Sequence, residues 1–340
     1  MVTIYDIAEK AKVSAMTVSR VINESGRISE KTRQRVKKVM EEMHYIPNHM
    51  ARSLVLQQTN LLYLLITDIT NPFYTTVARG AEDAARKSGF RLLFGNSDEN
   101  LSKEADYIDT ILASRADGVL VAPAGDASLP HLSLLRQHKV PFVLLDREVP
   151  GIDCDVVLGD SNEGGRALVD YLVSLGHQNI AFVNGSSTVS SARHRLQGYL
   201  EGLKQNGLPF RESYCMEASF GMINDLTDME AWLSSIDPFP SAIIAGNNVL
   251  ALETIRLLRG RGLSIPSDVS VCCFDDFGPF SEIDPFMTVI AQQAYEFGYQ
   301  GAQLLLERIK NRDFSEPWSK IVLPTELKPG RSVAERVHES

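Results

Sequence analysis

The chain is poor in cysteine, and its few cysteines form no metal-binding or disulfide pattern. Four occur in 340 residues: Cys154, Cys215, Cys272 and Cys273. No C-x-x-C motif and no Cys/His spacing of a zinc site is present, and the adjacent pair lies in the apolar run DVSVCCFDD. These features favour buried free thiols over metal ligands. The sequence therefore predicts no metal site, and nothing in it indicates a cofactor.

Long apolar runs and targeting signals are also missing. No stretch approaches the roughly 18 consecutive apolar residues of a membrane-spanning helix, and the first residues lack the apolar core and cleavage site of a signal peptide. With 44% hydrophobic and 23% charged residues, the composition is that of a globular protein. The length suits two or three domains. We expect a cytoplasmic protein with no membrane partner.

Signatures of catalysis and of nucleotide binding are absent from the sequence as well. It contains no G-x-G-x-x-G, G-x-x-x-x-G-K-[ST] or G-x-S-x-G element. Asp275 and Asp276 could form a catalytic pair, but neighbours on a strand point to opposite faces and would not easily share a proton. His177, in SLGHQNIAF, lies at a predicted helix-to-strand turn, where a structural role is favoured over general-base catalysis. An enzyme therefore has little support.

The charge is unevenly distributed along the chain. The net charge is −9, yet residues 1–60 carry ten Lys or Arg against six Asp or Glu, and the remainder carries 24 basic and 37 acidic residues. This asymmetry indicates a small anion-binding domain attached to a body that phosphates would repel.

The N-terminal segment shows two short helical patterns separated by a few residues. Thr3 can cap the first helix, and Asp6 favours its positive start. An apolar stripe follows at helical spacing: Ile4, Ile7, Ala8 and Ala11. Ser14 can cap the second helix, which ends near residues 23–26. Its inward side is formed by Val18, Val21 and Ile22, and its outward side by Ala15, Met16, Thr17 and Arg20.

A third helix is predicted after Ser29. Its inward positions are Val36, Val39, Met40 and Met43, and its outward, basic positions are Arg33, Arg35, Lys37 and Lys38. Pro47 then interrupts the helical pattern, and Asn48 can cap one more short helix as far as about Leu56. That helix is too short to be stable alone in water, so we expect it to order only when something holds it.

From Leu61 onward, apolar runs alternate with longer amphipathic patterns. The strand candidates are LLYLLITD, FRLLFGNS, DGVLVAP, PFVLLD, DVVLGD, NIAFVNG, AIIAGN, DVSVCCFDD and MTVIAQQ. Apolar strands joined by helices such as 74–87 and 190–206 predict parallel sheets covered on both faces. A break near residues 160–162 falls midway through the series, which is long enough for two doubly wound units.

Polar groups recur where these strands end, and ligands of open parallel sheets bind there. The segments concerned are Asp68 to Phe73, Asp146 with Arg147, Asn247 with Asn248, and Asp275 with Asp276. Taken singly, each of them is explained better by a loop cap or a solvated turn. Their recurrence at successive strand ends suits a polyhydroxylated small molecule.

The chain resembles the lactose-repressor (LacI/GalR) family of bacterial transcription regulators over nearly its whole length. The matching segments are TIYDIAEKAKVSAMTVSRVIN, YIPNHMARSL, DITNPFY, VDYLVSLGHQNIAFVNG, RLQGY, CFDDF and LPTELKPGRS. The resemblance implies an N-terminal all-α helix-turn-helix domain and an α/β core like a periplasmic binding protein, made of two Rossmann-like lobes. The implied parts are a DNA-binding domain (1–47), a hinge helix and linker (48–58), an N-terminal lobe (59–160 with 291–321) and a C-terminal lobe (161–290 with 322–332).

The resemblance also implies which residues contact DNA. The second helix would lie in the major groove, with Ala15, Met16 and Arg20 at base edges and Thr17, Ser19 and Asn23 near phosphates. An arginine can read a guanine through two hydrogen bonds, and alanine or methionine can touch a thymine methyl. The remaining implied DNA contacts are Thr3 and, in the hinge helix, Asn48, Ala51 and Leu54. Leu54 matches the leucine that wedges into the minor groove.

An effector site between the lobes is implied in the same way. Its residues would be Phe73, Asp146, Arg147, Arg195, Phe220, Asn247 and Asp275. An aromatic face with Asp, Asn and Arg side chains suits a sugar, although a purine, a sugar phosphate or a phosphorylated partner protein is an alternative within this family.

The resemblance therefore predicts a repressor whose affinity for operator DNA is controlled by a small molecule, acting as a homodimer on palindromic double-stranded DNA. The competing hypotheses are a free-standing sugar-binding module, which would not need residues 1–57, and a sugar-modifying enzyme, which would need a positioned acid and base.

Overall fold

The computed structural model describes residues 2–23, 25–45, 58–221, 226–278, 281, 283–311 and 317–336. The chain divides into two compact units, an N-terminal unit (Met1–Thr59) and a core unit (Asn60–Ser340). No helix in the described ranges is long and apolar enough to cross a lipid bilayer. The predicted hinge-helix residues Asn48, Ala51 and Leu54 lie outside the described residues.

The N-terminal unit contains the helices α1 (Ile4–Ala11), α2 (Ala15–Ile22) and α3 (Glu30–Glu42). The Asp6 backbone N–H donates to the Thr3 hydroxyl at 3.4 Å, and the Thr3 N–H donates to the Asp6 carboxylate at 2.7 Å, which is a capping box. At the next two helices the hydroxyls of Ser14 and Ser29 accept from the backbone N–H groups of Thr17 and Thr32, which caps each helix start. The three predicted helix starts are confirmed. The helices share a small core of Ile7, Ala8, Ala11, Val18, Val21, Val36 and Val39.

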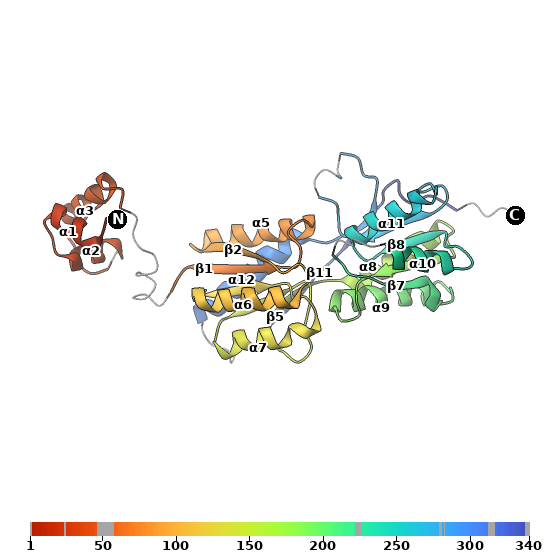
Figure 1. Ribbon diagram of the computed structural model, residues 1–340, viewed down its shortest axis with the longest axis horizontal. Coiled ribbons are helices and arrows are strands. Elements are labelled where there is room, and N and C mark those ends of the chain that lie inside the picture. Colours follow the sequence, from red (N-terminus) through yellow and green to blue (C-terminus); the bar gives the residue numbers. More distant parts are fainter. Residues whose placement is uncertain are drawn as a thin grey trace. The chain divides into compact units, whose positions relative to one another are not determined.

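The core unit contains two six-stranded sheets (Figure 1). The first is parallel throughout, in the order β11-β5-β4-β3-β1-β2. Its strands are β1 (Leu61–Ile66), β2 (Arg91–Asn96), β3 (Gly118–Val121), β4 (Phe142–Leu145), β5 (Asp155–Gly159) and β11 (Lys320–Leu323).

The second sheet has the order β12-β10-β9-β8-β6-β7, and β12 alone runs antiparallel to its neighbour. Its strands are β6 (Ile180–Asn184), β7 (Cys215–Glu217), β8 (Ala242–Ala245), β9 (Ser270–Phe274), β10 (Thr288–Ala291) and β12 (Glu326–Lys328).

Helices cover both faces of each sheet, which explains why the central strands are apolar on both sides. On the first sheet, α5 (Pro72–Lys87) and α12 (Ala294–Asn311) cover one face, and α6 (Leu101–Ser114) and α7 (Leu129–Gln137) the other. On the second, α8 (Ser161–Ser174) and α9 (Ser190–Gln205) lie opposite α10 (Thr227–Ser235) and α11 (Asn248–Gly260). The 3-10 turns η1 (Asp126–Ser128) and η2 (Glu212–Tyr214) complete the described elements.

Helices α5 and α12 pack backbone against backbone. A Cβ added at Gly80 would lie 2.0 Å from the Tyr295 carbonyl oxygen, and one at Gly298 would lie 1.8 Å from the Val77 carbonyl oxygen. No side chain fits at such distances, so glycine is required at both positions if the two helices are to stay this close.

We call the part around the first sheet the N-terminal lobe and the part around the second the C-terminal lobe. The chain passes between them after β5, after β10 and after β11. The passages lie side by side, because the Asp160 N–H donates to the Leu323 carbonyl at 2.9 Å and the Thr325 hydroxyl donates to the Asp160 carbonyl at 3.4 Å. Strand β10 ends at Ala291 and β11 at Leu323, and the domain boundaries stay predictions.

The nine apolar segments predicted as strands are confirmed as β1 to β6 and β8 to β10. The sequence pattern missed β7, β11 and β12. These three are short edge strands of three or four residues whose side chains are mostly exposed or half-buried, so none carries more than three apolar residues in a row.

Candidate nucleic-acid interface and ligand cleft

The outward side of α2 presents an exposed arginine beside a long apolar side chain. Arg20 is exposed and forms no ion pair with any described residue, and Met16 is 63% exposed. Ala15, which was predicted to face outward, is half-buried and packs partly against the small core. The helix therefore offers one free guanidinium and one large apolar group to a partner.

Small polar groups surround this helix. The Thr17 hydroxyl lies 2.9 Å from the Ser14 hydroxyl at the helix start, and the Asn23 amide donates to the Ser19 hydroxyl at 3.3 Å at the helix end. Thr3 is exposed at the start of α1. Backbone N–H groups and hydroxyls at helix starts are the donors that commonly bind phosphate.

The basic residues of α3 divide into paired and unpaired groups. Arg33 lies 3.8 Å from Glu30. Arg35, Lys37 and Lys38 are exposed and form no ion pair within the described part of the chain. The free cations make this unit able to attract a polyanion.

In the core unit, a cavity lies between the two lobes where strands of both sheets end. Loops after β1, β2 and β4 line it from the N-terminal lobe, and loops after β7, β8 and β9 with the start of α9 line it from the C-terminal lobe. All seven predicted effector residues line this one cavity: Phe73, Asp146, Arg147, Arg195, Phe220, Asn247 and Asp275. The structure thus brings them together, and their roles stay predictions.

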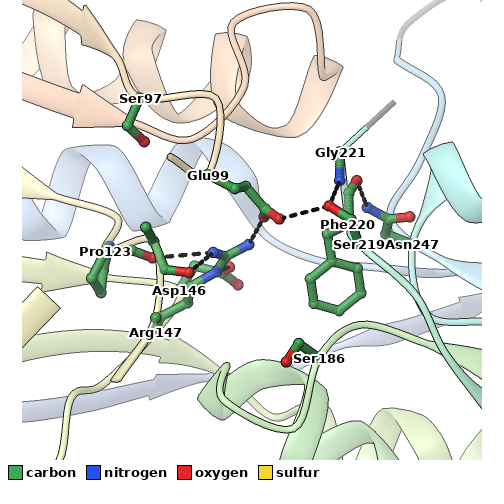
Figure 2. A network of polar contacts seen from close by, with 12 residues as sticks. Ser97, Glu99, Pro123, Asp146, Arg147, Ser186, Ser219, Phe220, Gly221 and Asn247 are labelled. Atoms are coloured by element: carbon green, nitrogen blue, oxygen red, sulfur yellow. Dashed lines mark hydrogen bonds and ion pairs between the residues drawn. The ribbon is translucent and has the colours of Figure 1, made fainter. Parts of the chain in front are cut away.

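Arg147 is buried within a network of acceptors (Figure 2). Its guanidinium donates to the Glu99 carboxylate at 2.6 Å and to the carbonyls of Pro123 at 3.1 Å and Ala124 at 3.4 Å. The Asp146 carboxylate lies 3.5 Å from its Nε. Two carboxylates and two carbonyls therefore hold this cation in one orientation.

Arg195 and Asp275 face each other across the C-terminal side of the cavity. Arg195 donates to the Gly246 carbonyl at 2.5 Å, lies 3.9 Å from the Asp275 carboxylate and sits 4.6 Å from the ring centre of Phe274. Asp275 also accepts from the Gln292 amide at 2.6 Å. Burial raises the pKa of Asp275, and the Arg195 charge opposes this shift.

Phe220 forms an aromatic wall of the cavity. The guanidinium of Arg147 lies 5.7 Å from its ring centre and that of Arg195 5.3 Å. The ring packs on Gly185, where a Cβ would lie 2.4 Å from a ring carbon, and the Phe220 carbonyl accepts from Asn247 at 2.9 Å. The absent side chain at Gly185 makes room for the ring.

A second aromatic group comes from the start of α5. The rings of Phe73 and Tyr74 meet edge to face at 5.1 Å, and the Tyr74 hydroxyl donates to Asp146 at 3.4 Å. Burial raises the pKa of Tyr74, so its hydroxyl stays protonated and remains a donor. Asn71 caps α5 and accepts from the Asn248 amide of the C-terminal lobe at 3.0 Å.

A clasp of polar contacts joins the lobes beside the cavity. Arg193 donates to both carboxylate oxygens of Asp126, at 2.8 and 3.1 Å, and the Asp126 N–H donates to the Thr188 carbonyl at 2.9 Å. The Glu148 N–H donates to the Ser190 hydroxyl at 2.8 Å. These contacts cross from one lobe to the other, so they exist only while the lobes are closed.

The closed cavity is small. It has a volume of about 20 Å³ open to the centres of water-sized spheres, which is room for roughly one water molecule. The side chains of Arg147 and Arg195 both line it. A ligand larger than water therefore requires these side chains to move or the lobes to separate.

Seven further residues that were not predicted as effector residues also line the cavity. They are Thr67, Asp68, Asn71, Tyr74, Glu99, Ser191 and Gly221. Four of them belong to or adjoin the segment 68–73, which was noted as polar at a strand end. Glu99 is likewise a polar residue shortly after a strand, β2, so the sequence could have indicated it. Ser191 lies at the start of α9, and nothing in the sequence marks it.

The structural interpretation of His177 and of the cysteines is supported. His177 is buried, with Nδ1 2.9 Å from the Ser241 hydroxyl and Nε2 3.1 Å from the Ala334 carbonyl, and burial lowers the pKa of its imidazole. All four cysteines are free, three of them buried and Cys215 half-buried. The described residues contain no group of three or more His, Cys, Asp or Glu side chains able to hold a metal ion.

The fold and the two sites define a ligand-binding α/β protein of two lobes that carries a separate helix-turn-helix unit. Residues 3–48 match the model of the bacterial regulatory proteins of the lacI family. Residues 59–326 match that of the periplasmic binding proteins and sugar binding domain of the LacI family.

The chain is similar to known proteins in sequence and in structure over almost its whole length. The chain is 35% identical to the HTH-type transcriptional regulator DegA of Bacillus subtilis (strain 168), over 96% of both chains. It is similar to the lac repressor dimer bound to operator and the anti-inducer ONPF, with a TM-score of 0.81 and 26% identity over 98% of this chain and 99% of that one. It is also similar to the transcriptional regulator CelR-cellobiose complex, with a TM-score of 0.72 and 28% identity over 98% and 100%.

The chain belongs to the LacI family of bacterial transcriptional regulators. It is a DNA-binding regulator of transcription and not an enzyme.

Proposed function

We propose that the protein is a repressor that binds a palindromic operator through its N-terminal unit and is controlled by a sugar bound between its lobes. The convergence of all seven implied effector residues on one interlobe cavity carries this proposal. A protein that acts on chromosomal DNA in bacteria works in the cytoplasm, and we place it there.

For DNA, the proposal assigns α2 to the major groove. Arg20 and Met16 are exposed on its outward side and would meet base edges, with Ala15 beside them. Thr17, Ser19, Asn23 and Thr3 would bind phosphates. The hinge positions Asn48, Ala51 and Leu54 stay part of the proposal from the family resemblance alone, with Leu54 as the minor-groove wedge.

For the effector, the cavity offers the chemistry that a sugar requires. Phe220 and Phe73 supply apolar faces for a sugar ring, and Asp146, Asn247 and Asp275 can accept from or donate to hydroxyls. Arg147 and Arg195 would turn their free N–H groups toward the ligand. The lac repressor and CelR structures hold an anti-inducer and cellobiose respectively, which supports a ligand of this class.

For assembly, we infer a homodimer in which the edge strand β2 takes part. Its side chains Leu93 and Phe94 are 39% and 47% exposed, and Leu101 at the start of α6 is 40% exposed. A monomer rarely leaves several large apolar side chains together in water. A two-fold contact would also give two helix-turn-helix units to a palindromic site.

We expect the relative arrangement of the two lobes to link ligand binding to operator affinity. A ligand can favour one lobe arrangement only through contacts that differ between arrangements, and the cavity has residues from both lobes. A change in lobe arrangement would alter how the paired hinge segments order on DNA. A coupling of about 1 to 3 kcal/mol would shift operator affinity by roughly 5- to 150-fold.

A thermal-unfolding screen of the full chain against sugars tests the effector site. A binding sugar at 100 times its Kd should stabilise the core unit by about 2.7 kcal/mol. Phe220→Leu should lose this stabilisation, because the stacking face is gone while an apolar side chain remains. Phe210→Leu is the matched control, since Phe210 is 53% exposed and does not line the cavity. If the sugar stabilises both variants equally, it does not bind in this cavity, and the proposed effector site is wrong.

A further inference from the structure

We propose that Glu99 makes the interlobe cleft selective for uncharged sugars over sugar phosphates and sugar acids. The inference rests on the proposed effector site and deepens it by naming the ligand class. It follows from the charges that the described residues place around the cavity and from the way each cation is already paired.

Acidic groups outnumber basic ones in the lining. The carboxylates are those of Asp68, Glu99, Asp146 and Asp275, and the cations are those of Arg147 and Arg195. Glu99 itself is nearly buried, with a side chain 16% exposed. An anionic ligand would therefore enter a cleft that already holds an excess of negative charge and little water to screen it.

Each of the two cations already lies beside a carboxylate of the protein. Arg147 has Glu99 at 2.6 Å and Asp146 at 3.5 Å, and Arg195 has Asp275 at 3.9 Å together with the Gly246 carbonyl. A phosphate or carboxylate needs a free guanidinium to form paired, charge-assisted hydrogen bonds. Arg147 cannot turn its Nη2 group to an anion without losing Glu99, and an anion bound to Arg195 would lie beside the Asp275 carboxylate.

What remains open in the cavity is suited to hydroxyl groups. Arg147 Nε, Arg195 Nε and Ser191 Oγ are buried and have no hydrogen-bond partner among the described residues. They offer two separate N–H donors and one hydroxyl that both donates and accepts. A sugar hydroxyl also donates and accepts, so it can satisfy each of these atoms and the nearby carboxylates at the same time.

Among the carboxylates, Glu99 is the one whose charge can be removed with the smallest disturbance. It comes from the loop after β2, reaches across the cleft and accepts from the Ser219 hydroxyl of the C-terminal lobe at 3.4 Å (Figure 2). A glutamine has nearly the same shape, its carbonyl oxygen can still accept from Arg147, and its NH2 group can donate to the Ser219 hydroxyl. Glu99→Gln would therefore leave Arg147 with a single carboxylate and less negative charge around it.

The test is calorimetric titration of the full chain with matched pairs of ligands: D-ribose and D-ribose 5-phosphate, and D-glucose with D-glucose 6-phosphate and D-glucuronate. In the wild type, the neutral sugar that binds should do so at least about tenfold more tightly than its anionic counterparts, since like charges repel in the cleft. Glu99→Gln should reduce this ratio by about tenfold, chiefly by improving the binding of the anions.

Two variants separate charge from structure. Glu99→Asp keeps the charge and should keep the wild-type ratio. Ser219→Ala removes the hydrogen bond across the cleft without altering any charge, so it should weaken neutral and anionic ligands alike and leave the ratio unchanged.

Tighter binding of an anion than of its neutral sugar by the wild type would overturn the selectivity proposal and leave the effector site standing. An unchanged ratio in Glu99→Gln would also overturn it. Failure of every sugar, neutral or anionic, to bind the wild type would instead overturn the proposed sugar effector, and the selectivity with it.

Discussion

Breaking the clasp between Asp126 and Arg193 should weaken effector binding by a predictable amount. The two side chains form two hydrogen-bonded contacts across the cleft, and each is 36% exposed. Exposed ion pairs are worth about 0.2 to 1 kcal/mol, and a two-point contact between a guanidinium and a carboxylate belongs at the upper end. The clasp forms only between closed lobes, so its energy contributes to the closed arrangement alone.

If the effector binds the closed arrangement, Arg193→Ala should therefore raise the effector Kd by about two- to fivefold, which is 1 kcal/mol or less. Asp126→Ala should do the same. The double variant should be little worse than either single one, because both substitutions remove the same interaction. Calorimetric titration of the four proteins with the sugar found in the thermal screen gives the coupling energy.

Arg166→Ala provides the matched control. Arg166 forms comparable ion pairs with Glu163 and Asp170, but all three residues lie on α8 within one lobe. Its removal should leave the effector Kd unchanged. Effects of Asp126→Ala and Arg193→Ala that simply add, or a Kd that neither variant alters, would refute the view that these residues stabilise the liganded closure.

Three further predictions concern DNA, acid stability and assembly. In a titration of related DNA sites, Arg20→Ala should relax base preference, whereas Lys37→Ala should weaken all sequences similarly and reduce the salt dependence. Burial lowers the pKa of His177, so the unfolded state binds its proton first, and the free energy of unfolding should fall as the pH drops below the ordinary value of 6.5. Urea unfolding at several pH values measures this dependence, and the free energy of unfolding should change less with pH in His177→Gln than in the wild type. An equal pH dependence in the two proteins would show that other groups cause the effect. Phe94→Arg should shift the sedimentation of the full chain from dimer to monomer, and an unchanged dimer would exclude β2 from the contact.

Much of the fold could be predicted from local sequence. The caps Thr3, Ser14 and Ser29 define helix starts because each needs only a hydroxyl and the next turn of backbone. Eight of the nine predicted strands are central, and they could be found because strands buried on both faces are apolar along their whole length, whereas the edge strand β2 was found from its apolar residues 92–94. The polar residues at their ends mark the cavity because parallel strands end at one edge.

What could not be predicted depends on contacts between distant segments. The edge strands β7, β11 and β12 pair through backbone groups, and their few side chains do not form the long apolar run by which the central strands are recognised. Glu99 and Ser191 are 92 residues apart in the sequence, and they line the same cavity only because the two lobes lie against each other. The Asp126–Arg193 clasp likewise joins surface residues of two lobes, and each is an ordinary exposed charge when its own segment is considered alone.

The central claim is that a ligand in the cleft controls operator binding, and Asp275→Asn tests it most directly. Asparagine keeps the shape of the side chain and tolerates the left-handed backbone at this position, where φ is 69°. It removes a buried charged acceptor, and hydrogen bonds to charged groups are worth about 1.5 to 3 kcal/mol. Asp276→Asn is the control, because the Asp276 side chain does not line the cavity and lies 3.6 Å from Lys328.

The measurement is the operator affinity of the full chain with and without effector, on a site selected from random palindromic DNA. The wild type and Asp276→Asn should show an effector-dependent shift of roughly 5- to 150-fold. Asp275→Asn should bind the operator with wild-type affinity in the absence of effector and show no shift at an effector concentration that saturates the wild type. An effector shift of wild-type size in Asp275→Asn would contradict the account.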